Sequence, residues 1–274
     1  MLTLAGTRID AISIGGVETC IQLPKQKLAF DIGRCPRSAV FRETILFTHA
    51  HMDHMGGVAF HAATRGLMHM SAPTYVVGPE SAEALDGFLE AARRLDRSDL
   101  ACKIVPVGPG GEIPLRHNLI AKPFRAVHVV PTQGYGIWER RQKLKSEYQG
   151  LSGDVIRDKK LAGEQITEAV DAPVFAFTGD TMIEVVEREE VVRKAKVLVM
   201  ECTFIDERVP VDKAREKGHI HLDEIAERAE LFENEAILLT HFSARFNAAE
   251  IQAALDKKLP AGLREKVTAL TSHH

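Results

Sequence analysis

The sequence predicts an α/β fold in which helices cover β-sheets, and two observations support this. Short runs of aliphatic and β-branched residues recur along the whole chain, and they alternate with stretches whose apolar residues follow helical spacing. Mixed strand and helix order of this kind is typical of α/β layers. In addition, four polar motifs each follow a predicted strand, and strand ends are where layered α/β folds assemble their sites.

The predicted elements follow from these patterns in chain order. We expect strands at 28–32, 44–48, 74–77, 103–107, 121–130, 174–178, 196–202, 236–240 and 267–270. We expect helices at 81–95, within 221–233 and at 248–255. In the second helix Leu222, Ile225, Ala226 and Ala229 form one apolar face.

Length and composition limit the possible classes of protein. The 274 residues suit one large α/β domain, so we expect a single domain over 1–274. No apolar run approaches the ~20 residues of a membrane span, and the N-terminus lacks a secretory signal, so we expect a cytoplasmic protein with no membrane partner. The net charge of −3 means that a polyanionic partner would need a local basic patch. Four scattered cysteines without a CxxC pair are expected to be free thiols.

The segment "THAHMDHMGG" at 48–57 places three histidines and an aspartate at the end of a predicted strand. His49 and His51 alternate along the strand exit, while Asp53 and His54 follow on the turn into a helix. Imidazole and carboxylate groups without a nearby thiolate favour an open, catalytic zinc-type site over a structural one. Four candidate ligands on one short turn are too many for one ion, so we expect two adjacent ions.

Three further residues can complete such a pair of sites. His128, Asp180 and His241 each lie at or just beyond an apolar run, where an unpaired polar group would be costly. Taken singly, either histidine could be a satisfied core residue and Asp180 could be a helix N-cap. Together with the first motif they become candidate metal ligands.

These motifs carry a resemblance to a known family. "THAHMDHMGG", His128, "GDT" at 179–181 and His241 resemble the metallo-β-lactamase superfamily, a four-layer αββα sandwich with a dinuclear metal site. "SIGGVETC", "LAFDIGRCP", "VMECTF", "GHIH" and "ILLTHFSARF" further resemble its short, plant-type tRNase Z branch. That resemblance implies a zinc-dependent endoribonuclease that removes the 3′ trailer of precursor tRNA, leaving a 3′-hydroxyl. The alternative is a phosphodiesterase of the same superfamily acting on a small molecule or a cyclic nucleotide.

The resemblance also implies roles for the metal ligands. Two zinc ions per chain, or manganese as a substitute, would be bound. His49, His51 and His128 would hold one ion, Asp53, His54 and His241 the other, and Asp180 would bridge them. Asp53 would also orient the water. A homodimer is implied as well.

Catalysis at a phosphodiester needs two further functions. A ribose 3′-oxygen leaves poorly unless it is protonated, and Glu201 with His219 is the candidate proton donor, with His221 as second choice. Ser243 and Arg245 offer a hydroxyl and a guanidinium for phosphate oxygens, although Arg245 could equally cover a strand edge.

Residues 138–168 form the least regular region, and we expect a protruding insertion there. The densest basic patch of the chain comprises Arg140, Arg141, Lys143 and Lys145, with Lys159 and Lys160 further along. The resemblance implies that this insertion is the exosite that binds tRNA away from the cut. The alternative is a solvated charged loop. His273 and His274 are given no role.

Overall fold

The computed structural model describes residues 1 to 271, and their strands form two seven-stranded sheets. His273 and His274 lie outside the described residues. The first sheet runs in chain order through β1 (Leu2–Leu4), β2 (Thr7–Ile14), β3 (Glu18–Leu23), β4 (Leu28–Phe30), β5 (Thr44–Leu46), β6 (Thr74–Val77) and β7 (Lys103–Pro106). The second runs in chain order through β8 (Ile113–Pro114), β9 (Leu119–Arg125), β10 (Gln133–Leu144), β11 (Thr167–Phe177), β12 (Val197–Glu201), β13 (Ala236–Thr240) and β14 (Val267–Ala269).

The two sheets share one pairing pattern. In each, the first four strands pair antiparallel and the last four pair parallel. The carboxyl ends of the parallel strands in each sheet therefore meet at one edge, as in other layered α/β folds that place their sites there.

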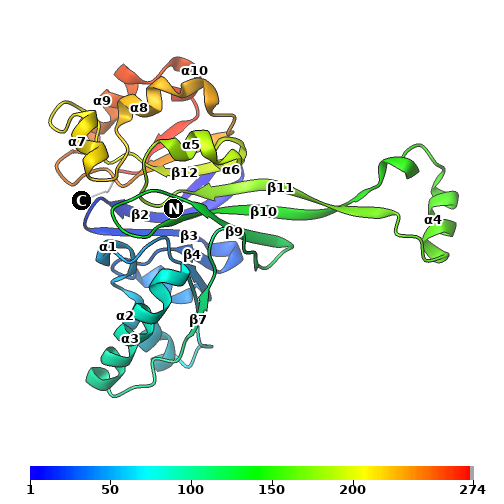
Figure 1. Cartoon of the computed structure of the whole chain (residues 1–274), viewed down its shortest axis with the longest axis horizontal. Coiled ribbons are helices and arrows are strands. Elements are labelled where there is room, and N and C mark those ends of the chain that lie inside the picture. The colour runs from blue at the N-terminus through cyan, green and yellow to red at the C-terminus, as the bar shows by residue number, and fades with distance from the viewer. Residues whose placement is uncertain (272–274) are drawn as a thin grey trace.

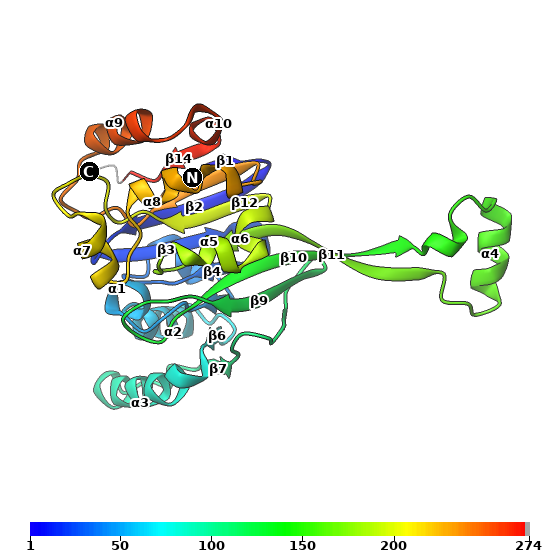
Figure 2. The same ribbon diagram turned by 45° about the horizontal axis from the view of Figure 1, so that its top comes forward.

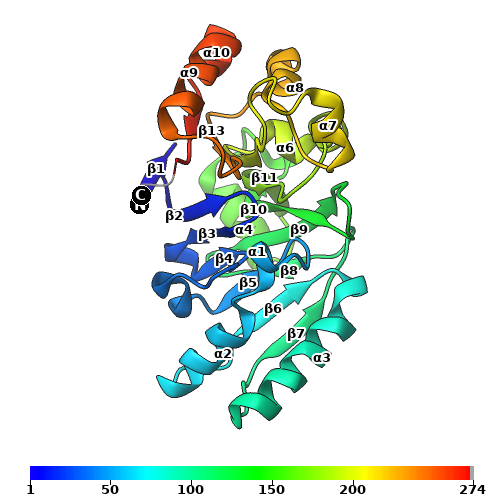
Figure 3. The same cartoon turned by 90° about the vertical axis from the view of Figure 1, so that its left-hand side faces the viewer.

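Helices cover the outer face of each sheet, as Figures 1 and 3 show. The first sheet is covered by α1 (Met52–Met55), α2 (Val58–Leu67) and α3 (Pro79–Asp96). The second is covered by α5 (Glu184–Arg188), α6 (Glu190–Lys194), α7 (Val211–Glu216), α8 (Leu222–Glu227), α9 (Ala248–Lys258) and α10 (Ala261–Arg264). Among residues 1 to 271, no helix has the length and apolar character that crossing a membrane requires.

The buried apolar residues form three clusters, one at each boundary between layers. Along β12, Val197 and Val199 face the first sheet, whereas Leu198 and Met200 face the helices. Because both faces of such a strand are buried, its sequence is a continuous apolar run. The four-layer αββα sandwich implied by the resemblance is confirmed, and the four cysteines are free thiols in the structure, as expected.

Most predicted elements are present, with shifted ends. The helix at 81–95 is α3, the helix at 248–255 is α9 and continues to Lys258, and the helix within 221–233 is α8 followed by a 3-10 turn at Ala229–Leu231. The strand at 121–130 was wrong at its C-terminal end, because β9 stops at Arg125. Beyond it, the Val127 amide donates to Thr181 Oγ1 instead of to a neighbouring strand.

The insertion at 138–168 protrudes as predicted, but the expectation of irregular structure was wrong. β10 and β11 continue out of the second sheet as a two-stranded antiparallel ribbon, paired as far as Leu144 and Thr167. Its tip holds a 3-10 turn (Ser146–Tyr148) and helix α4 (Gly153–Leu161), far from the sandwich in Figures 1 and 2. A solvated ribbon has no buried face, so its sequence lacks the alternation that identifies a strand.

Candidate metal centre

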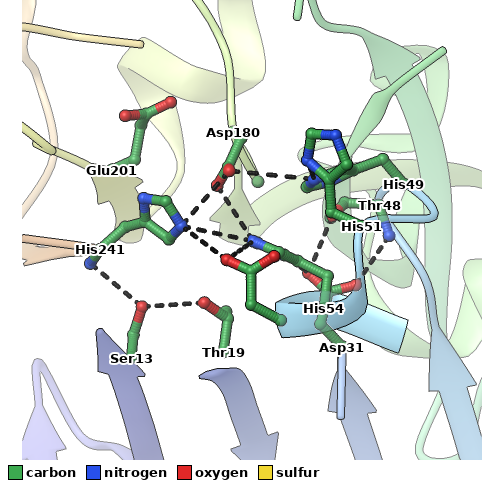
Figure 4. Close-up of polar contacts among 12 residues, drawn as sticks. Ser13, Thr19, Asp31, Thr48, His49, His51, His54, Asp180, Glu201 and His241 are labelled. Atoms are coloured by element: carbon green, nitrogen blue, oxygen red, sulfur yellow. Dashed lines mark hydrogen bonds and ion pairs between the residues drawn. The ribbon is translucent and has the colours of Figure 1, made fainter. Parts of the chain in front are cut away.

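All seven predicted metal ligands meet at one place, although they come from both sheets. Figure 4 labels five of them, which are His49, His51, His54, Asp180 and His241. His49 and His51 follow β5, and Asp53 and His54 lie in α1. The remaining ligand candidates, which follow β9, β11 and β13, are His128, Asp180 and His241. No helix begins at Asp180, since α5 starts at Glu184, so the N-cap alternative does not apply.

The first group of candidate ligands consists of three histidines and Asp180. His51 Nδ1 lies 3.0 Å from His49 Nε2 and 3.4 Å from His128 Nε2. Asp180 Oδ2 lies 3.8 Å from His49 Nε2. The four ligand atoms all lie within 4.8 Å of one another, which is close enough for one ion to contact them all.

The second group consists of Asp53, His54 and His241. His54 Nε2 lies 3.4 Å from His241 Nε2 and 3.7 Å from Asp53 Oδ2. Asp180 reaches this group as well, with Oδ1 3.3 Å from His54 Nε2 and Oδ2 3.3 Å from His241 Nε2. Asp180 thus lies between the two groups, in the position expected of a bridging carboxylate.

In four of the histidine rings, the Nδ1 atom, which is not the nitrogen that faces the cluster, contacts a neighbouring residue. His54 Nδ1 lies 2.8 Å from Asp31 Oδ2, and His128 Nδ1 lies 2.9 Å from the Gly218 carbonyl. The other two contacts are His49 Nδ1 to Thr48 Oγ1 at 3.0 Å and His241 Nδ1 to Thr203 Oγ1 at 2.9 Å. Contacts of this kind fix the ring orientation and leave the other nitrogen free for a metal. The residues present therefore fit a metal centre.

The charges of the cluster favour ionised carboxylates. Burial opposes ionisation of Asp180, but the neighbouring His241 and His54 outweigh it and hold the pKa of Asp180 well below its usual range. At Asp53 burial also acts to raise the pKa, and the hydrogen bond from His241 together with the charge of His54 lowers it to about 2. Burial, and then His54, lower the pKa of His49, which keeps this ring neutral. Anionic oxygens and a neutral imidazole are the forms that bind a cation.

Asp31 is a site residue that the sequence analysis missed. It is fully buried directly after β4, with a left-handed φ of 55°. Its carboxylate accepts hydrogen bonds at 2.8 Å from both the amide and the hydroxyl of Thr48, besides its contact with His54. The signal was present in "LAFDIG", where a charged residue follows an apolar run without a break.

The turn between β2 and β3 supports the second group. The Gly16 amide donates to Asp53 Oδ2 at 3.0 Å, and Ser13 Oγ accepts from the His241 amide at 3.0 Å. Gly15 packs so closely that an added Cβ would lie 2.8 Å from the His241 carbonyl oxygen. Ser13, Gly15 and Gly16 of "SIGG" thus hold Asp53 and His241 in place.

Glu201 and His219 lie together at the edge of the metal cluster. Glu201 is 1% exposed and accepts from the Thr181 amide at 2.6 Å and from Thr203 Oγ1 at 2.5 Å. His219 Nδ1 lies 3.1 Å from Glu201 Oε1 and 3.9 Å from Asp180 Oδ2. Burial disfavours the charged ring, but Glu201 and then Asp180 outweigh it and raise the pKa of His219 to about 9. The contact with Glu201 therefore favours the protonated form of His219 at the edge of the cluster.

His221 caps a helix instead of lying at the metal cluster. It is buried as the N-cap of α8, where Nδ1 accepts from the Asp223 amide at 3.1 Å and Nε2 lies 3.3 Å from the Asp206 carbonyl. Both ring nitrogens are occupied by the backbone, so the structure brings His219 to the cluster and uses His221 for the helix.

Comparison with known proteins agrees with this geometry. The family model described as Beta-lactamase superfamily domain matches residues 33–242. The chain is 45% identical over 272 residues to tRNase Z TRZ1 of Arabidopsis thaliana, covering 98% of this chain and 97% of that protein. It is 39% identical to the chloroplastic tRNase Z TRZ2 of the same plant, covering 96% of this chain and 75% of that protein.

The chain belongs to the tRNase Z family.

Solved structures place this tRNase Z in the same fold class. The crystal structure of human tRNase Z, short form, superposes with a TM-score of 0.61 at 18% identity, covering 86% of this chain and 93% of that chain. The metallo-β-lactamase fold protein YhfI of Bacillus subtilis superposes with a TM-score of 0.63 at 13% identity, covering 97% of each chain. The predicted superfamily fold and the predicted plant-type branch are both confirmed.

The other predicted residues near the site of this tRNase Z lie in a cavity of about 300 Å³ beside the second ligand group. Ser243 and Arg245 line it together with His219 and His241. Arg245 is exposed, with its guanidinium carbon 5.9 Å from the centre of the Phe204 ring. Lys217 lines the same cavity and was missed, although it lies only two residues before His219.

The four basic residues predicted for the insertion lie on the arm, and two of them are already paired. Arg140 Nε and Nη2 each lie 2.8 Å from a carboxylate oxygen of Asp171 on the opposite strand. Arg141 forms an ion pair with Glu139. Lys143 and Lys145 have no ion pair within the part of the chain that the structure describes. The segment 138–168 contains seven basic and six acidic residues, so the arm is a charged ribbon with no strong net charge.

Proposed function

We propose that this tRNase Z is an endoribonuclease that removes the 3′ trailer of precursor tRNA by hydrolysing one phosphodiester and leaves a 3′-hydroxyl on the tRNA. The observation that carries the proposal is the joint geometry of two ligand groups sharing Asp180 with the Glu201 and His219 pair at their edge. The two plant relatives named tRNase Z support the same activity. They do not favour the alternative, a phosphodiesterase of small molecules or cyclic nucleotides.

The two ligand groups would each hold one divalent cation, zinc or its substitute manganese. Such a pair supplies a water nucleophile at neutral pH and neutralises charge on the phosphodiester during in-line displacement. Asp53, fixed by the Gly16 amide, would orient the attacking water. The chain's own contribution on this side is to keep the ligands in place.

On the leaving side the chain acts through His219. The ribose 3′-oxygen departs as an alcohol if it receives a proton in the transition state. Glu201 holds the imidazolium with Nδ1 toward its carboxylate, so Nε2 carries the proton to be donated. The buried carboxylate stays in its bonds to Thr181 and Thr203, which fixes the ring during the transfer.

Substrate contacts would come from two separate regions. Ser243, Arg245 and Lys217 line the cavity next to the scissile phosphate, where a hydroxyl and two cations can bind phosphate oxygens. Lys143 and Lys145, together with the paired Arg140 and Arg141, would contact tRNA phosphates along the arm, which we propose as the exosite. The single-domain organisation, the homodimer and the cytoplasmic location remain predictions of the sequence.

Asp180→Ala tests the proposed mechanism. Because Asp180 lies within 3.8 Å of His49 and within 3.3 Å of His54 and His241, its loss should disturb both ligand groups and abolish cleavage of a 3′-extended precursor tRNA on a gel, by more than about 10³-fold. A chelator should do the same to the unmodified protein. Thermal unfolding of the variant should stay cooperative. Retained cleavage would exclude a dinuclear mechanism. Asp10→Asn, away from the site, is the control.

A further inference from the structure

A second cavity borders the first ligand group of the metal cluster. It has a volume of about 560 Å³ and opens beside His49 and His128 of the first ligand group. Its walls come from the start of α3 and from the loop 126–132. It shares no lining residue with the cavity that contains His219 and Arg245. The proposed mechanism above uses only the smaller cavity.

We infer that the larger cavity binds the first nucleotide of the 3′ trailer, an inference that rests on the proposed function. The reaction has a direction: the leaving 3′-oxygen belongs to the last nucleotide of the tRNA, and His219 must reach that oxygen. His219 lines the smaller cavity, so the last tRNA nucleotide lies there. The scissile phosphate sits over the two ligand groups, and the chain beyond it continues on the side of His49 and His128.

The size and lining of the larger cavity suit a nucleotide base. Small-molecule sites typically enclose about 300 to 1,000 Å³. Val127 and Val129 are 39% and 61% exposed at its edge, next to the exposed Pro131. Apolar side chains that remain exposed around a cavity offer a surface for the face of a base, and stacking of this kind tolerates any base.

The polar groups that line the cavity suit hydrogen bonds to the edge of a base better than contacts with phosphate. The buried hydroxyl of Thr132 finds no hydrogen-bond partner among residues 1 to 271, which is uncommon for a buried polar group. Glu80 lines the wall with a carboxylate that would repel phosphate but accept from the amino group of a base. Arg125, exposed at the cavity, can contact the next phosphate of the trailer.

Photo-cross-linking tests the location directly. A precursor tRNA with 4-thiouridine as its first trailer nucleotide is mixed with the full chain in the presence of a chelator, so that no cleavage is needed, and irradiated. Mass spectrometry should find the cross-link in a peptide that contains 78–81 or 125–133. A cross-link to 203–204, 217–219 or 243–245, or to neither set, would overturn the inference.

A filling substitution tests the consequence for cleavage. Ser81→Trp would place an indole in the cavity, and its matched control is Glu83→Trp, on the exposed side of α3 and outside the cavity. The wild type and Glu83→Trp should cleave a precursor whose first trailer nucleotide lacks its base about tenfold more slowly than the intact precursor. Ser81→Trp should cleave the intact precursor about tenfold more slowly than the control and should no longer distinguish the two RNAs.

The outcomes separate this inference from the proposed function. If the wild type does not cleave precursor tRNA at all in the presence of zinc or manganese, the proposed function fails. If it cleaves but treats the base-less RNA like the intact one, or if Ser81→Trp behaves like Glu83→Trp, the assignment of the larger cavity is wrong and the proposed function stands.

Discussion

Replacing Asp31 by Asn removes one charge and changes no volume, yet it should weaken metal binding strongly. Asp31 uses both oxygens: Oδ1 accepts from the Thr48 amide, and Oδ2 accepts from the Thr48 hydroxyl and faces His54 Nδ1, each at 2.8 Å. The bond to His54 keeps its proton on Nδ1 and leaves Nε2 free as a ligand. The Thr48 hydroxyl in turn contacts His49, so Asp31 acts on both ligand groups.

The magnitude follows from the donors and acceptors. An Asn amide has only one acceptor oxygen, so its NH₂ group must face either the Thr48 amide or His54. In the first case two donors meet in a fully buried site, at a cost of about 1–3 kcal/mol. In the second case the His54 proton moves to Nε2 and the ligand is lost. A factor of ten in affinity corresponds to about 1.4 kcal/mol. The affinity for the cation held by Asp53, His54 and His241 should therefore fall about 10- to 100-fold, which is the range typical of residues that support metal ligands.

The assay is a competition titration of zinc against a chromophoric chelator, with total metal content measured on the same samples. Asp31→Asn should lose affinity mainly for one of two ions. Asp10→Asn, on β2 with a 3.5 Å contact to Gln22, should bind like the wild type. If Asp31→Asn binds two ions with wild-type affinity, the argument that Asp31 fixes the ring of His54 is wrong.

Three further predictions follow from His219 and the arm. His219→Asn should slow precursor cleavage about 10²- to 10⁴-fold but spare bis(p-nitrophenyl) phosphate, whose leaving group needs no proton; equal losses on both would exclude the proton donor. In the metal-free protein, the raised pKa of His219, about 9, means that its stabilisation is complete below the unfolded value of about 6.5 and is lost as the pH rises through 9. Thermal midpoints between pH 6 and 10 should therefore fall more steeply for the wild type than for His219→Asn, and parallel curves would contradict this. Lys143→Ala with Lys145→Ala should lower tRNA affinity and reduce the salt slope by up to about two, whereas Lys25→Ala with Lys27→Ala on the sandwich should change neither.

The candidate ligands could be predicted from sequence because their signals are local. "THAHMDHMGG" contains four of them, and His128, Asp180 and His241 each follow an apolar run that reads as a strand. Strand ends in an α/β layer converge, so residues at such positions are expected to meet. The resemblance to tRNase Z then supplied the grouping, which spacing alone does not determine.

The residues that hold the ligands could not be predicted in the same way. Asp31 and His54 are 23 residues apart, and His54 and His241 are 187 apart, so nothing local in the sequence links them. His219 and His221 lie only two residues apart in "GHIH", and the start of α8 decides which of them becomes an N-cap. For the arm, sequence identified the basic residues but not their partners, because Arg140 meets Asp171 only across the ribbon.

The sequence by itself therefore determined the layered α/β class, the metal-binding character and the family, because these depend on residue types and on periodicities within single elements. The tertiary structure alone decided which nitrogen of His49, His54, His128 and His241 is held by a neighbour, and whether His219 or His221 lies at the cluster. It also decided which arm cations are paired and which two cavities border the metal centre. These depend on distances between strands of two different sheets. Burial makes such contacts strong, but a local sequence pattern cannot predict them because the partners lie far apart in the chain.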